Sequence, residues 1–217
     1  CVVTAEGGKT LSRIIFDPAP DTLWPESSHG SVPTLVFLSH GHPEHVLGTL
    51  NWLTNHKREP VKVIASAPIC KYLKRRSRNG GDQFVSVTAG DAVEEDGWKI
   101  QVFGWDHMGL LPPGFRMKLG YFAKLVAHPI LFGRIATEGI GGPAHHPMLG
   151  FRIESSQEKT NPLIYFGEGI HRHTEMHRLR FVLDSAQNVA LVAAVEPEDV
   201  ARIPHLLKEF SIEKMYV

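Results

Sequence analysis

The sequence predicts an α/β fold, because short apolar runs typical of strands alternate with stretches that have a helical pattern. This alternation continues through all 217 residues, and no internal repeat, low-complexity tract or linker interrupts it. We therefore expect one domain spanning residues 1–217. The composition, 42% hydrophobic and 21% charged, is typical of a folded globular protein.

The first half of the chain is predicted to form five strands, each a short run rich in Val, Ile or Phe that ends at a turn signal. These strands are residues 12–16, 34–38, 61–65, 84–87 and 98–103. Helices are predicted over residues 43–55 and 68–76. Pro43 suits the first position of a helix, because the N–H that proline lacks would have no partner there. A turn is expected over residues 94–97.

The second half repeats the pattern. Strands are predicted at residues 150–154, 163–166, 189–193 and 212–217, with helices over about 174–186 and 197–210. Interleaved strands and helices favour layers in which helices cover sheets. Both chain ends, at Cys1 and Val217, interrupt strand-like sequence, so we expect the first and last segments of the fold to be missing.

Residues 108–147 differ from the rest, because they are rich in large apolar side chains and interrupted by proline and glycine. A segment of this length is unusual as a plain connector. We expect an insertion or lid over the active site, the alternative being a small helical subdomain packed on the core. Four basic residues would lie beside its apolar surface: Arg116, Lys118, Lys124 and Arg134. That combination suits a small-molecule substrate that is hydrophobic, amphiphilic or anionic, the alternative being a membrane surface.

Charge and composition narrow the function. Lysine plus arginine and aspartate plus glutamate both number 23, so the chain lacks the basic excess of nucleic-acid-binding proteins and no nucleic-acid partner is expected. No apolar run is long enough for a transmembrane segment. Two cysteines exclude a disulfide scaffold and favour a reducing, cytoplasmic location. Thirteen histidines point to a metal or acid–base site.

The strongest motif lies between a predicted strand and a predicted helix, at residues 38–45, Leu-Ser-His-Gly-His-Pro-Glu-His. In extended chain, residues two apart point the same way, so His40 and His42 can face one point. Glu44 and His45 are added where the chain turns into the helix. Imidazoles joined by a carboxylate are typical of catalytic zinc sites. The alternative is a polar surface loop that happens to contain histidines.

This H-x-H-x-E-H segment closely resembles the H-x-H-x-D-H signature of the metallo-β-lactamase-fold hydrolase superfamily. Residues 14–18 are similar to the strand and Asp-Pro step that precede the signature, residues 89–107 to the strand pair that delivers a third histidine, and residues 165–169 to a Gly-Asp motif. The resemblance implies a four-layer αβ/βα sandwich with metals at one edge of the sheets. It also implies a hydrolase that uses one or two zinc, manganese or iron ions.

The resemblance assigns roles to individual residues. The first metal would be held by His40, His42 and His107, and the second by Glu44, His45 and Glu168, with Glu168 bridging. Glu44 and Glu168 would also be catalytic, and a metal-activated water would attack an ester, phosphodiester, lactone or amide. Asp17 would orient a ligand histidine, the alternative being a turn or capping aspartate before Pro18.

Three departures from the family pattern affect the second site. Glu44 and Glu168 stand where the family has aspartate, and each is longer by one bond of about 1.5 Å. Metal–ligand distances tolerate only about 0.2 Å, so the second site has a shifted backbone, a different metal or none. The third departure is the family's final histidine, which would lie beyond Val217 or be replaced by His171 or His173. These two histidines could also contact the substrate, the alternative being that both are exposed loop residues.

Two other functions remain open from the sequence. The same scaffold serves iron-dependent oxidoreductases, and a carboxylate-rich site is compatible with that chemistry. A degenerate, non-catalytic member with an incomplete second metal site is the other alternative. The metal content of the purified protein distinguishes the hydrolase, the iron-dependent oxidoreductase and the degenerate member.

Overall fold

The computed structural model describes thirteen parts of the chain. They are residues 2–7, 10–19, 33–55, 60–77, 81–105, 148–156, 161–167, 170, 176–183, 189–193, 201, 203–210 and 212–216. The predicted insertion or lid at residues 108–147 lies outside these parts.

A first sheet is built from the amino-terminal half of the chain, in the strand order β1-β2-β3-β4-β5. Its strands are β1 (Val2–Gly7), β2 (Thr10–Phe16), β3 (Thr34–Phe37), β4 (Val61–Ala65) and β5 (Phe84–Ser86). β1 pairs with β2 in an antiparallel hairpin, and all the other neighbours are parallel. The parallel strands therefore end at the same edge of the sheet.

A second sheet follows in the order β11-β10-β9-β8-β7-β6. Its strands are β6 (Ala92–Glu95), β7 (Trp98–Trp105), β8 (Met148–Ser155), β9 (Leu163–Phe166), β10 (Val189–Ala193) and β11 (Ile212–Tyr216). β6 to β9 are antiparallel neighbours, and β9, β10 and β11 run parallel.

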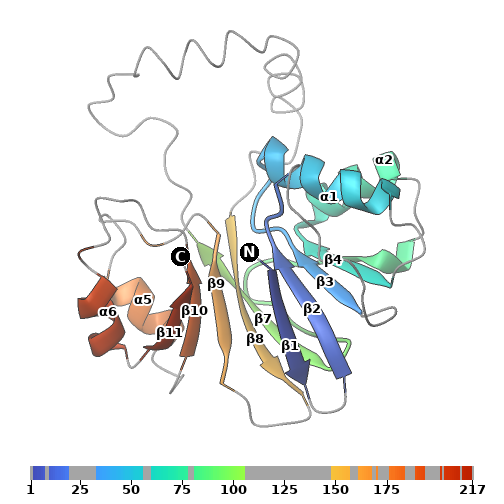
Figure 1. The fold of residues 1–217 in the computed structure, drawn as a ribbon. Coiled ribbons are helices and arrows are strands. Elements are labelled where there is room, and N and C mark those ends of the chain that lie inside the picture. Colours follow the sequence, from blue (N-terminus) through green and yellow to red (C-terminus); the bar gives the residue numbers. More distant parts are fainter. Residues whose placement is uncertain are drawn as a thin grey trace, which may run out of the picture.

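Helices cover the outer face of each sheet, as Figure 1 shows. On the first sheet lie α1 (Pro43–Asn55) and α2 (Ala67–Ser77), and on the second lie α5 (Met176–Leu183) and α6 (Ile203–Glu209). A short 3-10 helix at Gly81–Gln83 leads into β5. None of the helices in the described parts is long and apolar enough to cross a membrane.

Alternation of side chains along the strands produces three apolar layers. In β2, Ile14 and Phe16 belong to a cluster between the two sheets, whereas Ile15 belongs to a cluster that includes Trp52 of α1. A third cluster joins the second sheet to its helices and includes Leu179 of α5. Successive residues of a strand point to opposite faces, so one strand feeds two layers. The result is helix, sheet, sheet, helix, which confirms the predicted four-layer αβ/βα sandwich.

The predicted boundaries of the helix at residues 43–55 and the strands at 61–65, 163–166 and 189–193 are confirmed to the residue. The turn predicted over residues 94–97 is wrong in its first half. Glu94 and Glu95 lie in β6, and only Asp96 and Gly97 form the turn, with φ values of 48° and 83°. Two successive positive φ values match the twist of a two-residue hairpin, which extends the pairing to Glu95 and Trp98.

Candidate metal centre

The histidine segment, residues 38–45, connects the end of β3 to α1. Its first residue continues the sheet pairing, because the backbone nitrogen of Leu38 donates to the oxygen of Ile64 at 3.0 Å. The carbonyl oxygen of His42 then accepts from the backbone nitrogens of His45 and Val46, both at 3.1 Å. These bonds make His42 the capping residue of α1 and bring His45 into its first turn, with Pro43 at the first helical position as the sequence predicts.

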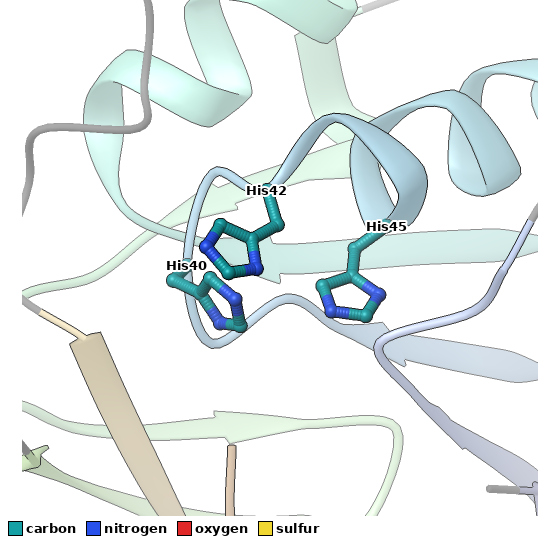
Figure 2. A group of neighbouring side chains, drawn as sticks. All are labelled: His40, His42 and His45. Carbon is teal, nitrogen blue, oxygen red and sulfur yellow. The ribbon is translucent and has the colours of Figure 1, made fainter. Parts of the chain in front are cut away.

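Three histidine side chains meet at this segment. His40, His42 and His45 each offer a nitrogen, and the three nitrogens lie within 4.8 Å of one another. Figure 2 shows the rings of His40 and His42 side by side in the loop, with His45 approaching from the first turn of α1. The ring centroid of His40 lies 4.1 Å from that of His42 and 5.0 Å from that of His45.

The donor set of this cluster fits a metal ion. Two nitrogens bound to one zinc are at most about 4.2 Å apart, twice the Zn–N distance of about 2.1 Å, so small side-chain shifts suffice. Nδ1 of His45 is buried and has no hydrogen-bond partner among the described residues. Buried polar atoms are normally paired, so one ring nitrogen of His45 lacks the partner that burial normally requires.

Asp17 lies beside the cluster, directly after β2. Its backbone nitrogen donates to the oxygen of Phe37 at 2.9 Å, and its φ of 40° lies in the left-handed region, which aspartate tolerates better than most residues. The carboxylate accepts three hydrogen bonds. Its Oδ1 accepts from the backbone nitrogen of Ser39 at 2.9 Å, and its Oδ2 accepts from Ser39 Oγ at 2.5 Å and from the hydroxyl of Tyr165 at 2.6 Å.

Ser39 connects Asp17 to the histidines. Its Oγ lies 2.7 Å from Nδ1 of His40, and its side chain is almost fully buried. Sequence reasoning did not assign a role to Ser39, although a hydroxyl directly before a candidate ligand was a usable signal. Tyr165 was also missed, and no local signal could have found it, since it is 148 residues from Asp17.

Two glycines allow close packing around this arrangement. A Cβ added to Gly167 would lie 2.4 Å from Oγ of Ser39, and one added to Gly48 of α1 would lie 2.2 Å from the backbone oxygen of Pro18. Both distances are too short for real atoms. Gly167 therefore lets the end of β9 lie against Ser39, and Gly48 lets α1 lie against the chain that follows Asp17.

Several of the expected site residues lie outside the described residues: His107, Glu168, His171 and His173. The backbone of Glu44 lies in α1, but its side chain is not described. The strands that lead toward His107 and Glu168 are described. β7 ends at Trp105 opposite Met148, and β9 ends with Phe166 opposite Gly150. Between these two β8 residues, Leu149 donates its backbone hydrogen to the oxygen of Ser39 at 2.8 Å, so both strands end at the edge nearest the histidine segment.

No protein-family model and no curated protein match this sequence. Solved structures do. A mutant of the CmlA β-hydroxylase matches with a TM-score of 0.55 at 10% identity, over 100% of this chain and 43% of that one. This chain thus spans less than half the length of the β-hydroxylase.

Two further solved structures match with lower TM-scores. The Rm3 metallo-β-lactamase matches at 0.43 with 12% identity, over 98% of this chain and 77% of that one. A metallo-β-lactamase superfamily protein from the archaeon Sulfolobus tokodaii matches at 0.42 with 12% identity, over 96% and 78%. At identities this low, a match shows similarity of fold and nothing about function. The match at a TM-score of 0.55 shows that this chain shares its fold with part of the CmlA β-hydroxylase.

Proposed function

We propose that the protein is a metal-dependent hydrolase that holds at least one divalent cation on its histidine segment. The observation that carries this proposal is the cluster of three imidazole nitrogens within 4.8 Å of one another. One of these rings, His45, has a buried nitrogen without a hydrogen-bond partner among the described residues.

The proposed ligands form two groups, for a first and a second cation: His40, His42 and His107, then Glu44, His45 and Glu168. The ends of β7 and β9 support the roles of His107 and Glu168, because each residue follows the last residue of its strand by two positions. Glu44 and Glu168 are proposed as the catalytic carboxylates. His171 and His173 are proposed as further ligands or substrate contacts.

A bound cation supplies two things in such a site: a water whose pKa is lowered to about 7, and polarisation of the substrate's carbonyl or phosphoryl oxygen. The chain's own residues hold the ligands in place. Asp17 and Ser39 fix the ring of His40 by hydrogen bonds. The first turn of α1 fixes the backbone of His42 and His45.

The proposed substrate is a small ester, phosphodiester, lactone or amide, hydrophobic or anionic in character. Its class rests on the apolar and basic sequence of residues 108–147. Elemental analysis of protein purified without chelator, followed by turnover of chromogenic esters, phosphodiesters and lactones, tests the proposal. We expect one to two zinc or manganese ions per chain and turnover that a chelator abolishes. Protein that binds none of zinc, manganese or iron would contradict it.

A second candidate function is iron-dependent oxidation. It is favoured by the match to the CmlA β-hydroxylase at a TM-score of 0.55, and by the glutamates at positions 44 and 168. Oxygen ligands of this kind suit iron as well as zinc. Stoichiometric iron with a visible absorption band would select this function over hydrolysis. Metal well below one ion per chain would instead indicate a degenerate, non-catalytic member of the fold.

A further inference from the structure

We propose that Ser39 is a positioning residue that fixes His40 in one tautomer, with the ring hydrogen on Nδ1 and the lone pair on Nε2. The consequence for metal binding rests on the proposed function, because only a nitrogen with a free lone pair can bind a cation. The tautomer itself is a property of the metal-free chain. It can therefore be tested independently of any activity.

The tautomer follows from counting hydrogens. An ionised carboxylate only accepts hydrogen bonds, and a serine hydroxyl has a single hydrogen to donate. Ser39 donates that hydrogen to Oδ2 of Asp17 at 2.5 Å. At its other contact, 2.7 Å from Nδ1 of His40, the serine oxygen must therefore accept. The hydrogen of this bond belongs to Nδ1, and since a neutral imidazole has one N–H, Nε2 is left with the lone pair.

The surrounding contacts keep the serine hydroxyl directed at the carboxylate. The backbone nitrogen of Ser39 donates to Oδ1 of Asp17 at 2.9 Å, which fixes the orientation of the carboxylate relative to the serine. The hydroxyl of Tyr165 lies 2.6 Å from Oδ2 and 3.2 Å from the backbone oxygen of Gly167, and the carboxylate is the nearer acceptor of its single hydrogen. Ser39 is 1% exposed and His40 is 3% exposed, so solvent has little access to either partner.

This arrangement resembles the orienting bonds found around many metal ligands, with one difference. Metal-binding histidines commonly donate their second N–H to a carboxylate, a carbonyl or a water. Here a serine hydroxyl lies between the histidine and the carboxylate, so Asp17 acts on His40 only through Ser39. The tautomer is consequently sensitive to any change that gives Asp17 a hydrogen to donate.

Asp17→Asn is the decisive variant. Asparagine has nearly the same shape and tolerates the positive φ at this position. Its oxygen can still accept from the backbone nitrogen of Ser39, which turns its NH₂ group toward the serine hydroxyl. Ser39 must then accept from Asn and donate to Nδ1 of His40, which moves the ring hydrogen to Nε2. In the catalytic triads of hydrolases, replacing the aspartate by asparagine likewise leaves the histidine in the wrong tautomer.

The measurement is nitrogen-15 NMR of histidine-labelled, metal-free protein, at a pH well above the ordinary imidazole pKa of about 6.5. We expect His40 to carry its hydrogen on Nδ1 in the wild type and on Nε2 in Asp17→Asn. Zinc titration of the same samples should show an affinity about 10–100-fold weaker for Asp17→Asn.

Two further variants separate tautomer control from simple loss of packing. Tyr165→Phe removes one donor but keeps the carboxylate and the ring stacked on Phe16, so the Nδ1 tautomer should remain. Ser39→Ala removes the acceptor at Nδ1, so His40 should populate both tautomers.

The outcomes divide clearly. A wild-type His40 with its hydrogen on Nε2, or an Asp17→Asn protein that keeps it on Nδ1, overturns the inference even if the protein binds zinc. The expected tautomers in a protein that binds no metal support the inference and contradict the proposed function instead.

Discussion

The backbone nitrogen of Leu149 donates a 2.8 Å hydrogen bond to the backbone oxygen of Ser39. Leu149 lies in β8 of the second sheet, and Ser39 lies directly before His40 in the histidine segment, which follows β3 of the first sheet. This bond attaches the candidate metal site to both sheets. The position of His40 therefore depends on how the two sheets pack together, as well as on the sequence of its own loop.

Replacing Gly167 by alanine tests this dependence. The new Cβ would lie 2.4 Å from Oγ and 2.7 Å from Cβ of Ser39, so the serine must move away from Asp17 or His40. We expect a loss of about 1–3 kcal/mol in the free energy of unfolding, as for other overpacked sites, together with weaker zinc binding. Denaturant unfolding and zinc titration measure the two effects.

Gly104→Ala is the matched control for Gly167→Ala. Gly104 lies in β7, and a Cβ added there would have its nearest contact at 3.6 Å, with Cβ of Ala89, an ordinary van der Waals distance. Stability and zinc affinity should stay near wild type. Equal losses in both variants would contradict the role assigned to the Gly167–Ser39 contact.

Gly48→Ala should disturb the site from the other side. Its Cβ would lie 2.2 Å from the backbone oxygen of Pro18 and 2.7 Å from the backbone of Ala19, and backbone atoms yield less easily than side chains. We expect a melting temperature several degrees lower, because the added methyl group must push α1 from the chain that follows Asp17. A variant as stable as wild type by thermal unfolding would show that this contact relaxes freely.

His42→Ala should abolish both metal retention and turnover if the proposed function is correct. His42 contributes one of the three clustered nitrogens, and two remaining imidazoles make a much weaker site. Elemental analysis and activity assays measure the effect. His205→Ala is the control, because the side chain of His205 is 75% exposed on α6 and its ion-pair partner there is Glu209. A fully active, metal-loaded His42→Ala protein would refute the assignment.

Lys62 and Glu95 form an ion pair that joins β4 of the first sheet to β6 of the second. The hydrogen bond to Glu95 raises the pKa of Lys62 above its ordinary value of 10.5, with the charge of Asp96 adding to the effect against partial burial. A raised lysine pKa in the folded protein means that the pair stabilises the fold below pH 10.5, as long as its carboxylate stays ionised. This stabilisation is lost as the pH rises through the folded value.

Lys62→Met therefore should reduce the free energy of unfolding by less than about 1 kcal/mol at pH 8. The difference from wild type should shrink above pH 10.5, where the wild-type lysine loses its charge. Urea unfolding at several pH values measures this. A difference that grows with pH in that range would show that the side chain acts through packing and not through charge.

Local sequence patterns were sufficient for the layers of the fold and for part of the candidate site. Apolar runs and turn signals predicted the strands, and Pro43 predicted the start of α1, because such features depend on neighbours within a few residues. The spacing of His40 and His42 likewise predicted that their rings would meet, as they do. The error at Glu94 and Glu95 arose because two acidic residues resemble a turn in sequence, whereas pairing with β7 makes them a strand.

What the sequence alone determined is the set of candidate metal ligands and the order of the elements that present them. What only the tertiary structure decided is how these groups are held. Tyr165 reaches Asp17 across 148 residues, and Gly167 and Leu149 meet Ser39 from the opposite sheet. Such contacts depend on the packing of the two sheets. No periodicity along one strand encodes that packing, since periodicity specifies which face of a strand is buried and not which partner it meets.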